Sequence, residues 1–506
     1  MQFPSANDTV SVQDLAQLNE ALRKGSVGHQ VGAQASGEDL SPLVPQSIEN
    51  TLASATYTMK ELALWPSMPK INVSQNLHEY VVINEHGLDL DPFMAEGGGG
   101  SSFGTNRAEY ERKSVKIKYM AERREVSDVA SLIGLVGPQP QAIAAETERG
   151  TMSLLRKVER SLWMADEDVN SLAFDGVVKQ ISRDLSVGGF HDGADHLGLG
   201  RPLSDFQLDL KGKAPTVQLL QEILGHIYGA PFYGRPDCIY VEPRIHAELI
   251  QQSVQFGRHD QLMVQREGQA LTFGMAELAV MAPYGSVKIK AAPFLHRSEK
   301  MPAGASSSSA PAAPAFTAQP AETLAGAFAG GDKASDMEAG FYRYAVVAVS
   351  SAGYSAPTKA AAGVEVTAAN SRIDFTISDD TADYYRVYRT DKAAALADID
   401  EGSYKLLCTV PNKAAQVTPV RDLNMFRPDC SEIVFVEHSQ DIMEFARLLD
   451  FIRRPLAEVA TSRPFLLMLF GSPVVKVPRK CFVLRNAGSN YPIASAYGAT
   501  NLNFNP

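Results

Sequence analysis

An alanine-, serine- and proline-rich stretch, KMPAGASSSSAPAAPAFTAQPAE over 300–322, constrains the fold of this chain more than any other sequence feature. Sequence of this composition is typical of linkers, because it has too few large apolar residues to build a core. The pattern also differs on its two sides. Helical and strand periodicities alternate before it, whereas short alternating strands with turn signals follow it. We therefore expect an all-β unit inserted into a larger α+β protein.

The segment after the linker carries the pattern of a β-sandwich. In AGFYRYAVVAVSSAGYSAP every second residue, namely Tyr342, Tyr344, Val346 and Ala348, faces one way if the run is a strand. This run, with its turn AVSSAGYSAP, resembles the fibronectin type III domain and related immunoglobulin-like domains. The resemblance implies an all-β sandwich over 325–428. It implies no particular function, because such sandwiches are generic binding modules.

A glycine-rich loop, FMAEGGGGSSFGTN over 93–106, raises the question of a phosphate site. A dinucleotide fingerprint needs G-x-G-x-x-G between a strand and a helix, but the sixth position from Gly97 is Ser102. A Walker loop ends in Gly-Lys-Ser/Thr, and the next lysine here is Lys113. The loop therefore predicts no nucleotide site and no cofactor.

Two strand patterns flank this loop. LHEYVVINEHG precedes it and SVKIKYMAERREVS follows it, with Val115, Ile117 and Tyr119 alternating with polar residues. Strands joined by a long irregular loop form a hairpin, and loops of this length are usually functional or disordered. Glycine in the tip retains conformational freedom. We expect a long hairpin whose tip reaches outward.

Helical periodicity predicts the remaining elements before the linker. An amphipathic helix near residues 11–22 and a second one over 43–70, anchored by Ile48, Leu52 and Leu62, would belong to an extended arm. Residues 140–170 predict one helix about 45 Å long at ~1.5 Å per residue, with an Arg156–Glu159 pair on its flank.

An α/β part follows this helix. We expect a helix over 216–228, a buried strand over 238–241 and a helix after Pro243. The C-terminal run RPFLLMLFGSPVVKVPRKCFVLRNAG predicts two or three strands, broken at Gly471-Ser472-Pro473 and at Pro478.

Composition argues against several classes of protein. Lys and Arg total 47 against 58 Asp and Glu, which gives a formal net charge of -11. This balance argues against a protein whose main role is to bind nucleic acid, because such binding depends on clustered Lys and Arg. The basic strip RKSVKIKYMAERR over 112–124 is more simply a solvated strand face. The N-terminus has no signal-like apolar region, and no run is long enough to span a membrane. Four scattered cysteines fit a reducing compartment. We expect a soluble protein.

Motifs for catalysis and metal binding are weak. HDGADH over 191–196 matches no zinc or EF-hand spacing. G-x-S-x-G occurs over 100–104, but within the glycine-rich loop and not between a buried strand and a helix. We predict no catalytic, cofactor-binding or metal-binding residues, and therefore a protein that is not an enzyme.

The order of these parts resembles the major capsid proteins of tailed phages with the Hong Kong-type fold. The segments that carry the resemblance are SPLVPQSIENTLASATYTMKELALW, FMAEGGGG and RRPLAEVATSRPFLLMLFGSPVVKVPRK. It implies an α+β capsid fold with an inserted all-β immunoglobulin-like sandwich. The implied divisions are an N-terminal arm (1–75), an extended hairpin loop (76–128), a peripheral domain with a spine helix (129–214), an axial domain (215–300), a linker (301–324), the insertion (325–428), and a return to the axial and peripheral domains (429–506).

The resemblance also implies a function. A chain of this family would self-assemble into hexamers and pentamers of an icosahedral head shell, enclosing DNA without sequence-specific binding. Scaffold, portal and decoration proteins would be its partners, it would bind no membrane, and it would reside in the virion capsid after assembly in the host cytoplasm. The hairpin tip would contact neighbouring subunits through Phe93, Glu96, Gly97, Gly98, Gly99, Gly100 and Phe103.

Two other interpretations remain open from sequence. The chain could be another virion structural protein, such as a tail-sheath or baseplate component. It could also be an adhesin or carbohydrate-binding protein with a fibronectin-like module, although it lacks an apparent signal sequence and paired catalytic carboxylates.

Overall fold

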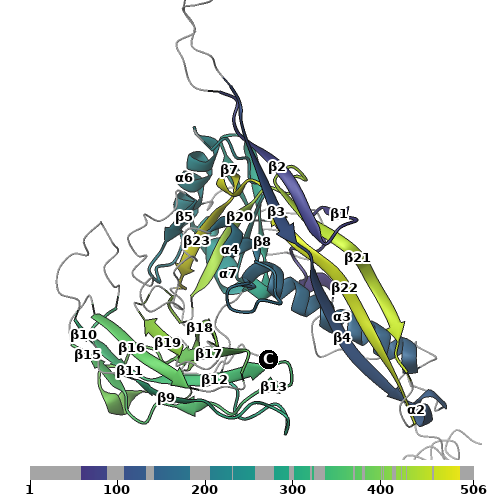
Figure 1. Cartoon of the computed structure of the whole chain (residues 1–506). Coiled ribbons are helices and arrows are strands. Elements are labelled where there is room, and N and C mark those ends of the chain that lie inside the picture. The colour runs from purple at the N-terminus through teal and green to yellow at the C-terminus, as the bar shows by residue number, and fades with distance from the viewer. Residues whose placement is uncertain are drawn as a thin grey trace, which may run out of the picture.

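The structure is a computed structural model, and Figure 1 shows its elements along the chain. It describes residues 59–87, 107–132, 142–182, 206–230, 232–256, 278–295, 301–318, 322–323, 337–367, 371–378, 382–399, 402, 404–412, 418–422, 424, 426–428, 430–457 and 461–489. The architecture is α+β. Two mixed sheets form the body, a two-stranded ribbon projects from it, and a separate β-rich unit lies beside it (Figure 1).

The first body sheet has six strands in the order β5-β23-β20-β6-β8-β7. Helices α6 and α7 cover one face, where alternate strand residues such as Ile239 and Val241 join their core; Cys238 and Tyr240 point to the opposite face. These elements are β5 (Gln207–Asp209), α6 (Val217–Tyr228), β6 (Cys238–Val241), α7 (Pro243–Phe256), β7 (Ala279–Ala282), β8 (Gly285–Ala291), the short helix η5 (Pro293–Leu295), β20 (Ser431–Val436) and β23 (Phe482–Ala487).

The predictions for this part are confirmed. Helix α6 begins after Thr216, whose side chain accepts a hydrogen bond from the N–H of Leu219, and so acts as its N-cap. Strand β6 covers the predicted residues, and α7 begins at Pro243, where a missing N–H costs no helical bond.

The second body sheet is long and has the order β1-β21-β22-β4. Helix α3 packs against one of its faces through Leu154, Val158 and Leu162, which share a core with Phe465 and Leu467 of the sheet. The elements are β1 (Lys70–Asn72), β4 (Lys118–Ser127), α2 (Asp128–Leu132), α3 (Ala142–Met164), α4 (Val177–Ile181), β21 (Met443–Pro455) and β22 (Ser462–Val475).

The predicted long helix exists but is shorter than expected. Helix α3 has 23 residues and ends at Met164, not near residue 170. The chain then turns, and the N–H of Gly176 donates to Ala165 O. A Cβ at Gly176 would lie 2.7 Å from the carbonyl oxygen of Trp163, so the returning chain approaches the helix end too closely for a side chain.

The expected helix over 43–70 is wrong in its described part. Met59–Glu61 is one turn of 3-10 helix (η2), and the following residues form a turn that leads into β1. Pro66 and Pro69 explain the difference, because proline lacks an N–H and disfavours helix in the residue before it. Leu62 is nevertheless buried, as predicted for an anchor.

The predicted break at Gly471-Ser472-Pro473 is also wrong, because β22 runs through it. A Cβ at Gly471 would lie 2.3 Å from Phe445 Cε1, so the glycine leaves room for that ring. The N–H of Phe445, opposite Pro473, donates to Pro69 on the β1 side. Phe445 and Pro473 are therefore a pair without mutual hydrogen bonds, so Pro473 needs no N–H toward β21. On its other side no ladder bond is lost, because the pairing with β4 ends at Gly471. The short helix η7 (Pro478–Lys480) does end the strand region where Pro478 predicts it.

The predicted hairpin is confirmed as an antiparallel ribbon of β2 (Leu77–Glu85) and β3 (Glu109–Lys116). The second strand pattern is divided in two, because Ile117 is buried at the junction and β4 continues into the long sheet. The N–H of Ile117 donates to Asn76 O, and this bond joins the two strands of the ribbon at its base.

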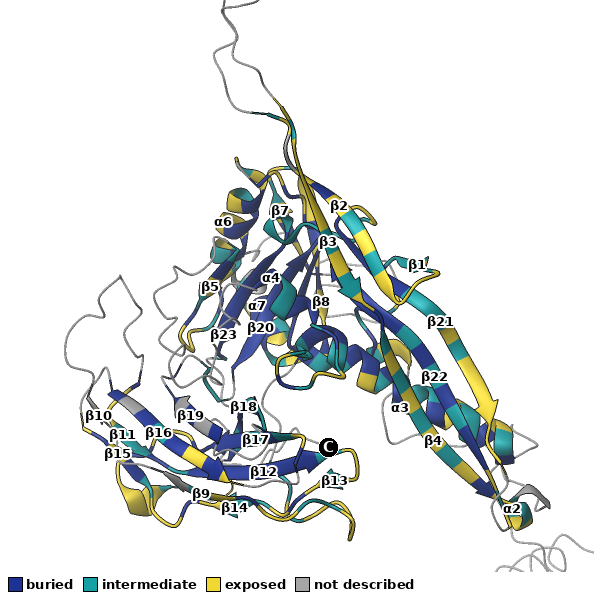
Figure 2. Ribbon diagram, viewed as in Figure 1, coloured by how far each residue is buried: buried dark blue, intermediate teal, exposed yellow. Residues whose placement is uncertain are grey.

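The β-rich unit consists of small sheets that share one core (Figure 2). Tyr342, Tyr344, Val346 and Ala348 all lie in that core, as their alternation predicts. The strands are β9 (Ala315–Ala318), β10 (Glu322–Thr323), β11 (Gly340–Tyr342), β12 (Tyr344–Ser350), β13 (Gly353–Tyr354), β14 (Thr358–Lys359), β15 (Val364–Val366), β16 (Ser371–Ser378), β17 (Tyr384–Arg389), β18 (Lys405–Pro411) and β19 (Thr418–Asp422), with the short helix η6 (Leu396–Asp398).

Part of the expected linker belongs to this unit. Strand β9 pairs with β16, and the N–H of Ser306 donates to Tyr354 O beside β12. Gly353, at a φ of 136°, lies under this contact, where a Cβ would come 2.1 Å from Ser306 Oγ. The low-complexity segment is therefore fastened along the β-rich unit.

Candidate functional site

The residues predicted at the hairpin tip, Phe93, Glu96, Gly97 to Gly100 and Phe103, lie outside the described residues, as do the HDGADH and G-x-S-x-G segments. The structure describes the two strands that lead to the tip. The candidate site is therefore the ribbon of β2 and β3 together with the surface at its base.

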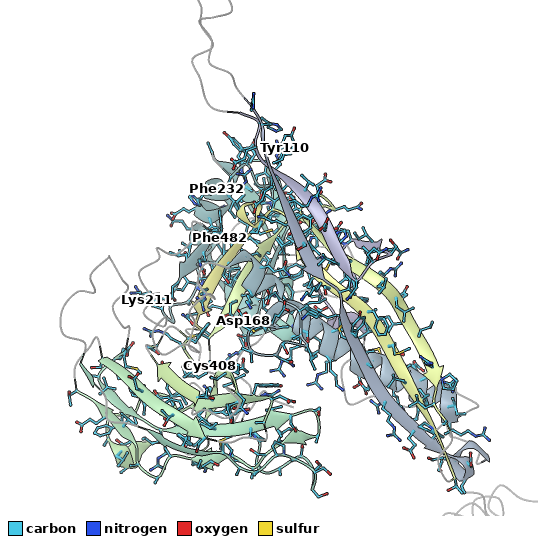
Figure 3. The ribbon with its side chains drawn as sticks, in the orientation of Figure 1. Tyr110, Asp168, Lys211, Phe232, Cys408 and Phe482 are labelled. Carbon is cyan, nitrogen blue, oxygen red and sulfur yellow. The ribbon has the colours of Figure 1, made fainter. Side chains whose placement is uncertain are left out.

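One face of the ribbon is apolar and exposed. Leu77, Val81 and Ile83 of β2 are 45%, 59% and 44% exposed, and Tyr110 of β3, opposite Ile83, is 66% exposed. Figure 3 shows Tyr110 toward the outer end of the ribbon, away from the body. A salt bridge between Arg112 and Glu79 lies on the same face. We call these four apolar side chains the ribbon stripe.

The opposite face of the ribbon turns toward the body. Val82 is buried, His78 and Tyr80 are half-buried, and Tyr80 and Val115 pack against the small core that Ile117 forms with Ala446 and Val474 of the long sheet. Because side chains alternate along a strand, this contact leaves the ribbon stripe facing away from the body. A two-stranded ribbon without a second layer is marginally stable in water, so a partner surface would stabilise it.

The base of the ribbon is fixed by polar contacts. His78 Nε2 lies 3.3 Å from Oε1 of Glu444, a carboxylate whose side chain is 1% exposed. The other Glu444 oxygen accepts a hydrogen bond from Lys476 Nζ at 2.8 Å. The ribbon thus leaves the body in a defined direction.

A second apolar surface lies on the long sheet, on the face opposite α3. Tyr119 and Ile452 are 58% and 46% exposed, and the strand register places the half-buried Leu466, Met468 and Phe470 on the same face. The ring centroids of Tyr119 and Phe470 are 4.8 Å apart, edge to face. We call these five residues the sheet patch. A contiguous apolar patch that is partly open to solvent can mark an interaction surface.

Five cations of the basic strip over 112–124 are paired with carboxylates of the same chain. Arg112 pairs with Glu79, Lys113 with Glu111, Lys118 with Glu167, Arg123 with Glu125 and Arg124 with Glu122. Burial alone would raise the pKa of Glu122, but hydrogen bonds from Lys157, Ser153 and Arg124 lower it below its usual value. This agrees with a solvated, internally neutralised strand face.

The described residues offer little for enzyme chemistry. They contain no group of three His, Cys, Asp or Glu side chains that could hold a metal ion. Burial raises the pKa of Cys238 to about 11 and that of Cys481 to about 12, so these thiols are poor nucleophiles. No helix in the described part of the chain is long and apolar enough to cross a membrane.

Sequence reasoning located the hairpin but missed the ribbon stripe. The alternation of Leu77, Val81 and Ile83 with polar or half-buried residues in LHEYVVINE was visible. What it could not tell is which face of the ribbon meets the body, because that depends on how the ribbon joins the long sheet.

Comparison with known proteins connects the chain to phage capsids. No protein-family model matches. A capsid protein of Enterococcus phage phiEF24C is 22% identical over 492 residues, which is 94% of this chain and 96% of the relative. The major capsid protein of Staphylococcus phage K is 21% identical over 474 residues, 88% of this chain and 90% of the relative.

Solved structures give weaker likenesses. The capsid of a native GTA particle covers 90% of this chain and 100% of its own, at 9% identity and a TM-score of 0.44. The mature capsid of bacteriophage PhiM1 covers 92% and 98%, at 8% identity and a TM-score of 0.40. Because both scores lie below 0.5, they establish no common fold. In sequence, the chain is similar over nearly its whole length to phage major capsid proteins.

Proposed function

We propose that this chain is a phage major capsid protein, which assembles with further copies of itself into the shell of the virion head. Its role is structural and not enzymatic. Similarity over nearly the full length of two phage capsid proteins supports this role. The structural observation that carries it is a ribbon that extends from the body (Figure 1). The outer face of this ribbon exposes an apolar stripe.

The ribbon stripe and the sheet patch suit one another as the two sides of a contact between copies. The stripe contributes Leu77, Val81, Ile83 and Tyr110, and the patch contributes aromatic and aliphatic side chains. Burying apolar surface stabilises by about 25 cal/mol per Å², and a repeating contact multiplies this gain over a closed shell. The glycine-rich tip beyond the ribbon would adapt to neighbours in rings of six and of five.

Charging the ribbon stripe is expected to prevent assembly. Val81→Asp together with Tyr110→Asp would bury two carboxylates in the contact, which costs several kcal/mol unless they are paired. We expect the assembled fraction, measured by light scattering and negative-stain microscopy, to fall by at least about tenfold. The isolated chain should keep its circular dichroism, because both side chains are exposed.

Leu172→Asp is the matched control, since Leu172 is 80% exposed and lies off the ribbon. It is expected to assemble like the unmodified chain. Normal shells from the doubly charged ribbon variant would contradict the proposed contact. An unmodified chain that stays monomeric in the presence of scaffold proteins would contradict the capsid role itself.

We further propose the domain division given by the family resemblance, with the β-rich unit as an immunoglobulin-like insertion. Strands β8 and β20, which flank it in sequence, are both part of the six-stranded sheet, and the unit has its own core. Such a unit would project from the shell. The shell would enclose DNA without sequence-specific contacts, in keeping with the net charge of -11.

Removing the insertion tests this division. We expect a chain in which a short Gly/Ser linker replaces residues 301–428 to fold and to form shells, because the cores of the body contain no residue of that segment. Electron microscopy of the resulting particles would show whether shells form. Folded monomers without shells would mean that the insertion is part of the lattice and not an appendage.

A further inference from the structure

A buried carboxylate on α3 holds the segment that leads out of the N-terminal region. Glu159 is fully buried, and it accepts hydrogen bonds from three consecutive backbone N–H groups, those of Ala63, Leu64 and Trp65, at 3.1, 2.8 and 2.8 Å. The indole N–H of Trp163 donates to the same carboxylate at 3.3 Å. The sequence pattern placed Glu159 on the helix flank, which is wrong, because the side chain is buried.

The local backbone explains why a carboxylate is needed there. The N–H groups of Ser67 and Met68 both donate to Leu64 O, so this segment makes one helical turn. The first N–H groups of a helical turn have no partner within it. Glu159 supplies the missing acceptors from another element, as a capping side chain would, and a negative charge is favourable at that end of a turn.

Other parts of the body grip the same segment. Tyr240 of β6 donates to Ala63 O at 3.4 Å, and its hydroxyl is 2.9 Å from His438 Nε2. Leu64 and Met68 are buried in the core between the two sheets. The ring of Trp65 lies 5.0 Å from that of Phe445 on β21. We call residues 59–70 the arm root.

We propose that Glu159 is a positioning residue that clamps the arm root where the two sheets meet, and that this fixed position is needed for correct contacts between copies. Three adjacent N–H groups on one side chain define the orientation of the turn as well as its position. The assembly consequence rests on the proposed capsid function; the clamp itself does not.

The two tryptophans of the chain, Trp65 and Trp163, both lie at this clamp, so intrinsic fluorescence reports on it directly. Glu159→Gln keeps the side-chain size but presents an amide NH₂ to a backbone N–H, which removes at least one bond. In the unassembled chain, we expect a red-shifted tryptophan emission and trypsin cleavage at Lys60 and Lys70 at least about tenfold faster, with unchanged far-ultraviolet circular dichroism.

Glu122→Gln is the matched control, because Glu122 also accepts hydrogen bonds from several donors beside α3 but contacts no tryptophan in those bonds. It is expected to leave emission and cleavage unchanged. Wild-type emission and cleavage in Glu159→Gln would overturn the clamp. Hydrogen exchange in the unmodified chain is a second test that needs no variant: unprotected amides at 63–65 would overturn the proposal as well.

Assembly is measured separately. We expect Glu159→Gln to form shells at a rate reduced by about tenfold or more, because the released arm root no longer holds one defined position. A released arm root with normal shell formation would overturn the positioning role while leaving the capsid function intact. Failure of the unmodified chain to form shells would count against the capsid function and leave the fluorescence and cleavage results standing.

Discussion

Replacing Asp422 by alanine is expected to destabilise the β-rich unit by about 3–5 kcal/mol, because it leaves a buried guanidinium without its charge partner. Asp422 and Arg389 are both nearly inaccessible, and Asp422 Oδ2 lies 2.6 Å from Arg389 Nη1. The same oxygen accepts a hydrogen bond from Tyr344 Oη at 2.7 Å, and Arg389 Nη2 donates to Asn424 Oδ1 at 2.6 Å.

Electrostatics agree with this geometry. Burial alone would lower the pKa of Arg389, but Asp422 and the neighbouring tyrosines raise it above its usual value, so the guanidinium stays charged. Burial also raises the pKa of Tyr344 well above its usual value, so its hydroxyl remains a donor. Arg389 and Tyr344 therefore both depend on the Asp422 carboxylate, and its loss would leave two buried polar groups without this acceptor.

Chemical denaturation of the full chain, with a probe specific to the β-rich unit, would measure this loss. Asp383→Ala serves as control, since that exposed carboxylate accepts a hydrogen bond from Ser351 in the same unit and should cost less than about 1 kcal/mol. A double change, Asp422→Leu with Arg389→Met, is expected to be less damaging than Asp422→Ala, because no buried charge remains. A loss below about 1 kcal/mol for Asp422→Ala would show that water or another acceptor replaces the carboxylate.

Much of the body could be predicted from local patterns. Helix α6, strand β6 and helix α7 follow the sequence pattern closely, and a Thr and a Pro mark the starts of the two helices. The first strand of the hairpin, β2, also follows from its sequence pattern, although the pattern predicted for the second strand falls mostly in β4. These elements are those whose local preferences agree with the final packing.

The wrong predictions concern residues whose environment is set by tertiary contacts. Gly471 and Pro473 look like a strand break, yet the glycine accommodates Phe445 and the proline needs no partner at that position. Glu159 looks like a surface residue, because its hydrogen-bond partners are nearly a hundred residues away in sequence. No local pattern records such contacts. For the same reason the exposed stripe on the strands was not predicted, and the family resemblance implied contacts only at the hairpin tip.

The turn after α3 illustrates a further interaction that sequence could not predict, and it leads to the second large effect. Lys179 of α4 reaches three carboxylates, with Nζ at 2.5, 2.7 and 2.8 Å from Asp166, Asp168 and Asp175. Its side chain is 11% exposed. Although burial alone would lower the pKa of Lys179, the hydrogen bonds that it donates to these aspartates raise the pKa above its usual value. Because the folded-state pKa is raised, this stabilisation is fully present below pH ~10 and is lost only in stronger alkali.

Lys179→Met is therefore expected to destabilise the body by about 2–3 kcal/mol at pH 7, since three carboxylates would then repel one another. The effect should be smaller than for Asp422, because the aspartates are partly solvated. Raising the salt concentration to about 1 M should recover part of the loss, because salt screens the repulsion between the uncompensated carboxylates. Urea denaturation at low and at high salt measures this. Lys157→Met is the control, because Lys157 is 65% exposed and pairs with Glu122 on the strand beside the helix, so its loss should stay below about 1 kcal/mol at either salt concentration. An equal loss at low and at high salt for Lys179→Met would mean that packing of the lysine stem, and not charge balance, holds the end of α3 against α4.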